Sequence, residues 1–399
     1  MEKMLRSAVR NGRSKSRRIF LLLSLLVFTS VSSFAKNRDN PDASSPPANR
    51  NQPLRVGVVG LVHTHVHWIL GREEKGDITI VGIVEPNREL AKKYSEQHGF
   101  SMDLVFDTLE EMVTNTDPQA VTAFNTIYDH LETVKFCAPR GIHVMVEKPL
   151  AVNYKHAKEM ASLARKHNIA LLTNYESSWY PSAHAAYAEL NGAGTIGAPR
   201  KIVFHTGHQG PIEIGVNSEF LEWLTDPVMN GGGALTDFGC YGANISTWLL
   251  GGKTPTSVSC TTQQFKPEKY PKVEDEATIV LTYPETQVII QASWNWPHAV
   301  KDMEIYGTSG SLRCPDGSTI ISRQEGDNPE QPLTAVPLPE GIDDPFSLLA
   351  KVVLEQYELP AYDLSSLENN LVVMQILEAA KVSARTGKTI RWREFFKED

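Results

Sequence analysis

The sequence predicts an α/β protein with two domains: a doubly wound parallel sheet comes first, and an α+β domain with an open, mainly antiparallel sheet follows. Three observations predict this. Apolar runs alternate with amphipathic stretches from residue 54 to residue 173, strand-like segments follow one another after residue 174, and 399 residues exceed one ordinary hydrophobic core.

The first domain, 54–173, contains near-continuous apolar runs separated by helical stretches. The predicted strands are 54–60, 78–85, 120–125, 144–147 and 169–173, and the predicted helices are 88–98, 109–115, 130–139 and 154–167. Apolar strands without alternation are typical of a parallel sheet that helices cover on both faces. We therefore expect a Rossmann-type sheet.

The second domain, 174–399, has predicted strands at 200–205, 256–264, 277–283, 287–293 and 303–307, joined by turn residues such as the TSG at 308–310. A helix at 235–250 follows the turn NGGG at 230–233, and another is expected at 364–386. This order indicates an antiparallel sheet that is open on one face.

The first 35 residues are typical of a signal peptide. Seven basic residues and one acidic residue precede or flank the apolar run IFLLLSLLVF, and Ser33-Phe34-Ala35 has the small residues of a cleavage site. SRRIFL at 16–21 also resembles a twin-arginine signal, so the twin-arginine and general secretory routes both stay open. We expect a periplasmic protein, with residues 36–53 as a flexible arm or linker.

Composition excludes several classes of protein. Without the signal peptide the net charge falls from −8 to −14, which disfavours nucleic acid as a partner. No apolar stretch after residue 35 reaches the length of a membrane span. The four cysteines show no C-x-x-C spacing, which disfavours a disulfide scaffold or a cysteine-zinc site.

The turn after the first strand reads VGVVGLVHTHVHW at 56–68 and allows two interpretations. A nucleotide turn G-x-G-x-x-G would have Gly60 followed by glycines where this chain has Val62 and His65. A metal site could use His63 and His67, four residues apart, with a third ligand from His205 or His208. Because no acidic residue lies between these histidines, we predict no metal.

Acidic Glu85 ends the second strand, about 25 residues after Gly60. A carboxylate there can accept hydrogen bonds from both ribose hydroxyls and would repel a 2′-phosphate, which favours NAD over NADP. The alternative is a surface glutamate at a strand end, before the turn residue Pro86.

The segment HVMVEKPL at 143–150 places Lys148 at the carboxyl end of a strand, where doubly wound sheets bind ligands. Beside a desolvated nicotinamide, the lysine could have a depressed pKa and exchange a proton with a substrate hydroxyl. The alternative is a simple ion pair at the strand end.

Together, EKP at 147–149 and GGGALTDFGCY at 231–241 identify a resemblance. The chain resembles the glucose-fructose oxidoreductase, inositol dehydrogenase and rhizopine catabolism (Gfo/Idh/MocA) oxidoreductases, over nearly all of 54–392, and EIYGTSGSL at 304–312 matches the turn of their open sheet. The resemblance implies a nicotinamide cofactor in the first domain and a sugar or polyol between that domain and the exposed face of the sheet of the second. It also implies that Lys148 transfers the proton while Asp237 and Tyr241, at an i, i+4 spacing, hold the reacting hydroxyl.

The chain departs from this family where Thr-Pro-Asn is usual, because Thr126-Ile127-Tyr128 stands there, after Asn125 and before His130. The predicted cofactor-binding residues are Gly60, Val62, His63, Glu85, Asn125, Thr126, His130, Glu147 and Lys148. The predicted substrate residues are Trp179, Tyr180, His205 and His208, since aromatic rings pack on sugar faces and histidines bond hydroxyls.

We therefore expect an exported, homo-oligomeric (dimeric or tetrameric) NAD-dependent oxidoreductase. It would interconvert a hydroxyl and a ketone on a sugar and retain its cofactor. One alternative is a glycoside hydrolase that works by transient oxidation and elimination. A second alternative is a carbohydrate-binding protein of the same fold without catalysis.

Overall fold

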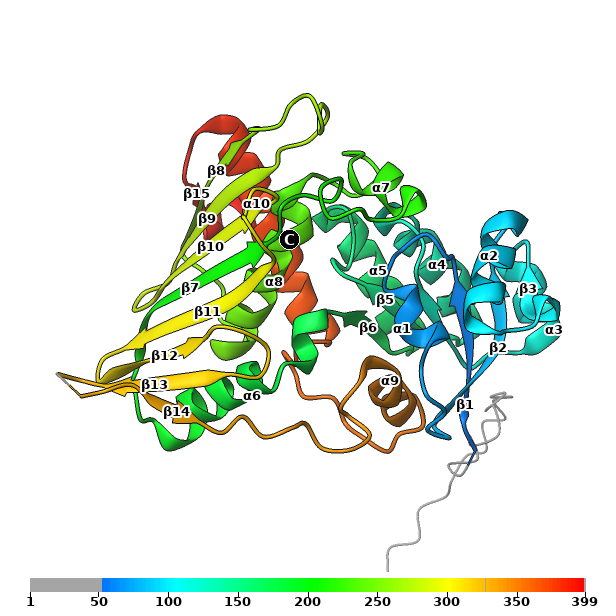
Figure 1. Cartoon of the computed structure of the whole chain (residues 1–399), viewed down its shortest axis with the longest axis horizontal. Coiled ribbons are helices and arrows are strands. Elements are labelled where there is room, and N and C mark those ends of the chain that lie inside the picture. The colour runs from blue at the N-terminus through cyan, green and yellow to red at the C-terminus, as the bar shows by residue number, and fades with distance from the viewer. Residues whose placement is uncertain (1–51, 327, 398–399) are drawn as a thin grey trace, which may run out of the picture. The chain divides into compact units, whose positions relative to one another are not determined.

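The computed structural model describes residues 52–326 and 328–397. The predicted signal peptide, and all but the last two residues of the predicted arm, lie outside the described residues. Figure 1 shows the two sheets with their helices. Within the described part of the chain, no helix is both long enough and apolar enough to cross a membrane.

The first sheet is parallel and has the strand order β3-β2-β1-β4-β5-β6, which confirms the predicted doubly wound fold. Its strands are β1 (Leu54–Val59), β2 (Ile78–Val84), β3 (Val105–Phe106), β4 (Ala120–Ala123), β5 (His143–Glu147) and β6 (Leu171–Asn174). All four residues of β4 are buried. Such continuous burial follows from the helices on both faces of the sheet.

Five helices connect these strands: α1 (Val66–Leu70), α2 (Arg88–His98), α3 (Leu109–Thr116), α4 (His130–Cys137) and α5 (Tyr154–His167). Short 3₁₀ turns lie between them, η1 (Met102–Leu104), η2 (Ile127–Asp129) and η3 (Ala138–Arg140). The predicted helix 130–139 ends as an α-helix at Cys137 and continues as η3, which contains Pro139. Asn87 and Asn153 begin α2 and α5 by accepting backbone N–H groups.

The second sheet has nine strands in the order β14-β13-β12-β11-β7-β10-β9-β8-β15. Only the pair β10 and β7 is parallel among the pairings described, so the predicted mainly antiparallel sheet is confirmed. The strands are β7 (Pro199–Gly207), β8 (Ser257–Gln263), β9 (Glu276–Thr282), β10 (Gln287–Ser293), β11 (Val300–Gly307), β12 (Gly310–Cys314), β13 (Ile320–Gln324), β14 (Gln331–Leu333) and β15 (Ile390–Arg391).

One face of this sheet is covered. Every second residue of β9 and β10 is buried, as expected for a strand with one face on a core. Helix α8 (Ala234–Leu249) is buried along its whole length and packs with β7 and β10, and α10 (Leu367–Thr386) packs with α8 and β8. Figure 1 shows both helices along the same face. The remaining elements are η4 (Glu176–Trp179), α6 (Pro181–Ala188), η5 (Glu189–Ala193), α7 (Ser218–Leu224), α9 (Pro345–Val353) and α11 (Trp392–Phe395).

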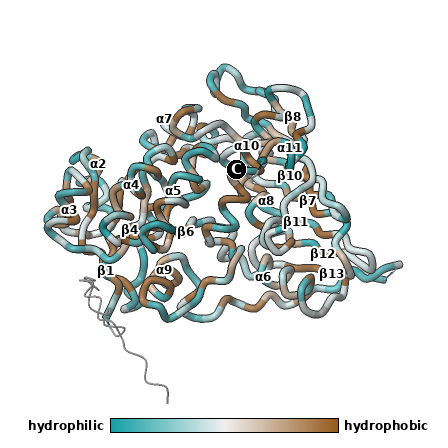
Figure 2. The backbone as a smooth tube through the Cα atoms, turned by 180° about the vertical axis from the view of Figure 1, so that it is seen from behind, coloured by the Kyte–Doolittle hydropathy of each residue, from teal (hydrophilic) through white to brown (hydrophobic). Residues whose placement is uncertain are grey.

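Helix α9 comes late in the chain but belongs to the core of the first sheet. Its residues Phe346 and Leu349 share a hydrophobic cluster with Leu54 of β1. Arg72 forms ion pairs with Asp77, just before β2, and with Asp344, which caps α9, and so connects α9 to the first domain. Figure 2 colours much of α9 as hydrophobic. A chain segment after residue 340 therefore completes the first core, which the linear pattern of the sequence did not indicate.

Candidate active site

The carboxyl end of β5 carries a buried ion pair. Lys148 follows β5, and its Nζ donates to Asp237 of α8 at 2.5 Å from Oδ1 and at 3.1 Å from the backbone oxygen. The indole N–H of Trp294 donates to the other carboxylate oxygen, Oδ2, at 3.0 Å. Lys148 and Asp237 are 6% and 4% exposed, and Trp294 is fully buried. Two residues 89 positions apart thus meet at the sheet edge where doubly wound folds bind ligands.

The pair keeps both partners charged. Burial acts to lower the pKa of Lys148, but the nearby carboxylate of Asp237 outweighs it and the pKa of the lysine is raised. Burial acts to raise the pKa of Asp237, but the Lys148 ammonium outweighs it and the pKa of the carboxyl is lowered. The predicted depression of the lysine pKa referred to a lysine beside a bound nicotinamide and stays a prediction, whereas contact with the Asp237 carboxylate acts in the opposite direction.

Tyr241 lies one turn after Asp237 on α8, as predicted. The Lys148 Nζ is 5.2 Å from the centre of the Tyr241 ring, and the Nζ of Lys301 is 4.9 Å from it. Burial raises the pKa of the Tyr241 phenol well above its ordinary value, so the phenol stays neutral and can donate a hydrogen bond. The sequence analysis missed Lys301, which pairs with Glu176 of η4. The available signal was the alternation of side chains along β11, which places Lys301 on the same face of the sheet as the buried Met303.

The turn after β1 needs glycine at its first position. Gly60 has φ +80°, and a Cβ there would lie 2.8 Å from backbone atoms of Asn125. The following N–H groups are paired inside the protein: Leu61 N donates to Glu85 Oε2 at 3.0 Å and His63 N to the Phe124 oxygen at 2.9 Å. The carbonyl of Val62 accepts from the Trp223 indole at 3.3 Å. The helix that follows the turn, α1, has only five residues, so its dipole contributes little to holding an anion there.

The three histidines of the turn go to different places. His65 Nδ1 lies 2.8 Å from Glu147 Oε2, and its ring stacks on Trp68. His67 Nδ1 lies 2.7 Å from Nε2 of His98, so it leaves the site. His63 is buried, and within the described residues its Nε2 has no hydrogen-bond partner, although Glu147 Oε2 is 4.0 Å away.

These contacts change which residues could bind a metal ion. His63, His65 and Glu147 bring possible ligand atoms within 4.8 Å of one another, whereas the predicted set contained His67. However, the backbone N–H of His65 donates to His63 Nδ1 at 3.1 Å, which places the proton of a neutral His63 ring on Nε2. Histidines that bind metal through one ring nitrogen carry the proton on the other. The arrangement therefore opposes a metal on His63 Nε2.

Glu147 organises the first domain's part of the site. Its Oε1 accepts from the amide of Asn174, at the end of β6, at 2.8 Å, while its Oε2 contacts His65. Burial raises the pKa of Glu147, although nearby His63 opposes this. Burial, with the charges of Lys148 and Lys301, lowers the pKa of His65 to about 3. His65 is thus a neutral ring that donates from Nδ1 to Glu147 and leaves Nε2 as an acceptor.

The other predicted cofactor residues line the same strand ends. Glu85 is buried, and its Oε1 accepts from Asn87 N at 2.9 Å. Asn125 directs Oδ1 to no partner among the described residues, and Thr126 accepts from Asp129 N to begin η2. His130 is fully buried, with Nδ1 3.1 Å from the Leu150 oxygen.

The predicted substrate residues divide. His208 packs edge-on against Phe238, and the charges of Asp237, Lys301 and Lys148 act on it, so it belongs to the site. His205 differs from His208 in position, and its predicted role in binding the substrate stays a prediction. It alternates with Thr206, which bonds the Phe238 oxygen on the α8 side, so His205 points to the opposite face of the sheet and contacts Asp302 at 2.6 Å.

The two aromatic residues predicted to contact the substrate, Trp179 and Tyr180, instead bond residues that hold the site together. The indole N–H of Trp179 donates to Asn174 Oδ1 at 3.1 Å, and the Tyr180 hydroxyl donates to Glu176 Oε1 at 2.6 Å. Both partners in turn hold residues at the site, since Asn174 bonds Glu147 and Glu176 pairs with Lys301. Trp179 and Tyr180 therefore position other residues in this structure. The sequence did not single out Asn174, and its place at a strand end was the only signal.

Two family models match the chain in consecutive parts. Residues 54–175 match the model described as "Oxidoreductase family, NAD-binding Rossmann fold", and residues 184–313 match the "GFO/IDH/MocA C-terminal domain".

Curated relatives and a solved structure agree with these matches. The chain is similar to trans-1,2-dihydrobenzene-1,2-diol dehydrogenase of Xenopus tropicalis, at 26% identity over 60% of this chain and 68% of the relative. It is also similar to 1,5-anhydro-D-fructose reductase of Ensifer adhaerens, at 25% identity over 69% of this chain and 81% of the relative. The fold is that of aldose-aldose oxidoreductase from Caulobacter crescentus complexed with glycerol, with a TM-score of 0.71 at 21% identity over 85% and 100%. The chain belongs to the Gfo/Idh/MocA family of oxidoreductases and has that family's NAD-binding Rossmann domain and C-terminal domain.

Proposed function

We propose that this protein interconverts a hydroxyl and a ketone on a sugar-like substrate, with a nicotinamide dinucleotide as redox partner and Lys148 as the group that exchanges the proton. The observation that carries the proposal is the buried contact between Lys148 and Asp237 at the carboxyl end of β5. A strand end at this edge is the place where a doubly wound sheet presents side chains to a ligand.

The residues present fit a dinucleotide. The glycine-only turn at Gly60 lies against Asn125, at the point where the strand order reverses between β1 and β4. Asn125 Oδ1 is a buried acceptor, and no described residue satisfies it. Gly60, Asn125 and the nearby Glu147 are the residues that would hold the group.

When bound, the nicotinamide supplies or accepts the hydride. The chain's own part is the proton. In reduction, the Lys148 ammonium donates a proton to the substrate oxygen as its carbonyl becomes a hydroxyl. In oxidation, a neutral Lys148 takes the hydroxyl proton as the substrate loses a hydride. Asp237 keeps the lysine charged, and the Tyr241 phenol can donate a second hydrogen bond to the same oxygen.

Because its pKa is raised, Lys148 is in its proton-donating form at neutral pH. A charged lysine is ready to donate, so reduction of a ketone needs no prior proton loss. Oxidation needs the minor neutral form, so its rate should rise about tenfold per pH unit below the pKa of Lys148. Glu85 favours NAD over NADP because its carboxylate would repel a 2′-phosphate.

The substrate class is drawn from the site and the relatives. By their names, one relative is a dehydrogenase of a dihydrobenzenediol and another is a reductase of 1,5-anhydro-D-fructose. His208, Tyr241 and Lys301 surround the ion pair with groups that can bond several hydroxyls. A polyol or sugar derivative suits this set.

The experiment is a half-reaction. Purified protein is loaded with NAD⁺, sugars and polyols are added, and the absorbance of reduced nicotinamide is followed. An increase with at least one substrate supports the proposal, and a protein with no measurable affinity for NAD⁺ or NADH contradicts it.

A second candidate is hydrolysis of a glycoside through transient oxidation. One observation favours it: the neutral ring of His65 donates from Nδ1 to Glu147 and leaves Nε2 as a second proton acceptor near Lys148 and Asp237. Net oxidation needs one such group, whereas elimination needs another to take the proton next to the new carbonyl. Release of nitrophenol from a nitrophenyl glycoside without added NAD supports hydrolysis, and its absence across several sugars removes it.

We further propose export of the protein to the periplasm with its cofactor retained, as a homo-oligomer. The basic and apolar residues of 1–35 support export, and scarcity of free NAD outside the cytoplasm supports retention. Mass spectrometry of the ligand released from denatured periplasmic protein tests compartment, cofactor identity and retention together. Native mass spectrometry of the same sample gives the number of subunits.

A further inference from the structure

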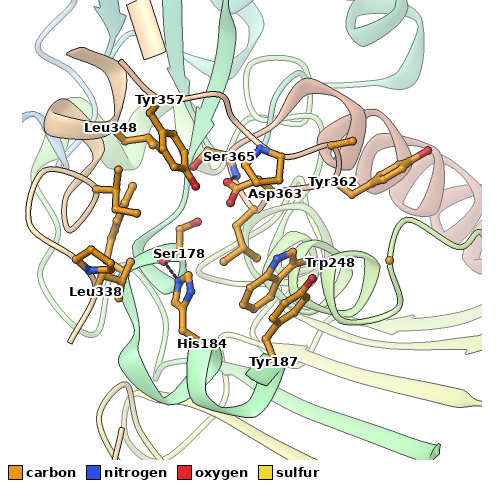
Figure 3. A pocket seen from close by; sticks show the side chains of 17 residues that line it. Ser178, His184, Tyr187, Trp248, Leu338, Leu348, Tyr357, Tyr362, Asp363 and Ser365 are labelled. Atoms are coloured by element: carbon orange, nitrogen blue, oxygen red, sulfur yellow. Dashed lines mark hydrogen bonds between the residues drawn. The ribbon is translucent and has the colours of Figure 1, made fainter. Parts of the chain in front are cut away.

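A second cavity lies away from the ion pair, between η4, the end of α8 and the segment that leads into α10. Its volume is about 260 Å³. Figure 3 shows Ser178, Tyr357, Asp363 and Ser365 around its centre, with Trp248 and Tyr187 at one side. A water molecule occupies about 30 Å³ in the liquid, so the space exceeds several waters. It is close to the lower end of the volumes of small-molecule sites.

Two hydroxyls in the wall of this cavity have no hydrogen-bond partner among the described residues. Ser178 and Ser365 are 3% and 1% exposed. The Oγ of each is buried, and no described residue bonds it. A buried hydroxyl left without a hydrogen bond destabilises the folded protein, so such groups usually have a ligand or ordered water. Both serines line the same space.

The rest of the wall combines a carboxylate with aromatic rings. Asp363 accepts from Ser365 N at 2.9 Å through Oδ1, and its burial raises the pKa of the carboxyl. Tyr187 stacks on Trp248 with the ring centres 4.3 Å apart and the planes 12° apart. Hydroxyl and carboxylate oxygens next to flat aromatic surfaces suit a molecule with many hydroxyls and some apolar faces.

This cavity is separate from the ion pair. Asp237 stands in the first turn of α8 and Trp248 in its last, eleven residues apart. At 1.5 Å per residue they are roughly 16 Å apart along the helix. Lys148, Asp237 and Tyr241 do not line the cavity within the described residues.

We propose that this cavity is a second binding site, for an uncharged, hydroxyl-rich molecule of monosaccharide size. The Ser178 and Ser365 hydroxyls and the Asp363 carboxylate bond its hydroxyls, and the aromatic pair covers an apolar face. Binding at this site does not require hydride transfer, so the proposal can be tested independently of the proposed reaction.

Tryptophan resonances distinguish the two sites. The full protein is labelled with 5-fluorotryptophan, and its seven tryptophans are assigned by single Trp→Phe variants. Trp248 reports on the cavity, and Trp294, bonded to Asp237, reports on the ion pair. D-glucose is then titrated without NAD. We expect a saturable shift of the Trp248 signal, also in the Lys148→Met variant.

Substitutions test the two hydroxyls. Ser178→Ala and Ser365→Ala should each weaken the glucose-dependent shift of Trp248 about two- to tenfold, the value of one hydrogen bond. Tyr283→Phe is the matched control, because it removes another buried hydroxyl that no described residue bonds, outside the cavity. It should leave the titration unchanged. D-glucuronate should bind more weakly than glucose because Asp363 repels its carboxylate.

Three results would overturn the proposal: no Trp248 shift at any glucose concentration, an unchanged midpoint in the Ser178→Ala/Ser365→Ala double variant, or equal binding of glucuronate. Thermal unfolding of the serine variants accompanies each titration. If they unfold at lower temperature, the more conservative Ser365→Cys variant takes their place with the same expected weakening.

Discussion

Two strand ends of the same sheet differ in how their polar residues are held. At the end of β5, Lys148 meets Asp237 directly, and Trp294 bonds the remaining carboxylate oxygen. In the turn after β1, neighbouring histidines separate: His65 contacts Glu147, while His67 contacts His98. At the end of β5, a single contact keeps both Lys148 and Asp237 charged. In the turn after β1, each histidine has a different partner.

The difference shows which parts of the site can be predicted from local sequence spacing alone. Asp237 and Tyr241 share a helix face because their spacing is four, and Lys148 lies at the sheet edge because a strand ends there. These facts are local. The partners of the histidines come from β5 and α2, which no spacing within the turn could indicate.

The largest expected effect is on the β5 side. Lys148→Met should lower turnover by about a thousandfold or more, because general acid–base groups contribute 10²–10⁴. Reduced nicotinamide absorbance after sugar addition measures it. Lys135→Met, which removes an exposed lysine paired with Glu132, is the control. Equal turnover in the two variants would assign the proton to another group.

The turn after β1 should respond through stability. Gly60→Ala places a Cβ against Asn125 at a positive φ, so it should cost at least about 2 kcal/mol. Gly99→Ala is the matched control: its φ is +79°, and no atom in the described part of the chain lies within 4 Å of the new Cβ. That control should cost about 1 kcal/mol. Urea unfolding measures both, and equal losses would mean that the turn does not pack on Asn125.

A pair of identical substitutions separates the histidines. His65→Gln should lower kcat/KM about tenfold, since the ring between Glu147 and Trp68 is lost. His67→Gln should stay within about twofold, because its partner His98 is outside the site. The pH profile adds a check. With a pKa of about 3, His65 should contribute no ionisation between pH 5 and pH 8 in the wild type. Equal losses in both variants would remove the distinction.

A smaller effect than that of Lys148→Met or His65→Gln is expected at Trp294. Trp294→Phe removes the N–H that bonds Asp237 Oδ2 but keeps an aromatic ring in the core. One hydrogen bond to a carboxylate is worth about 1.5–3 kcal/mol at most, and Lys148 still holds the other oxygen. We expect turnover to fall a few-fold, measured by the same absorbance. A loss as large as that of Lys148→Met would mean that Trp294 positions the whole pair.

Most of the fold could be predicted from the sequence. The parallel sheet and the mainly antiparallel sheet follow from the pattern of apolar residues in the sequence, and the ends of the predicted elements moved by a few residues. For example, the helix predicted at 364–386 begins at Leu367 because Ser366 caps it. Helix α9 was missed because its apolar run is short and its packing partner, β1, is almost 300 residues earlier. The catalytic candidates were predicted by motif, whereas Asn174, Lys301 and the true partners of His65 depend on tertiary contacts.

The most direct test is the pH dependence of sugar oxidation in the wild type and in Asp237→Asn, with bound NAD⁺ and single-turnover absorbance. The carboxylate of Asp237 raises the pKa of Lys148, so its neutralisation should lower that pKa and move the rising limb of the profile to lower pH. Asp302→Asn, at the pair on the opposite sheet face, should leave the profile in place. An unchanged limb in Asp237→Asn would contradict the assignment of Lys148 and Asp237 as the proton-transferring pair.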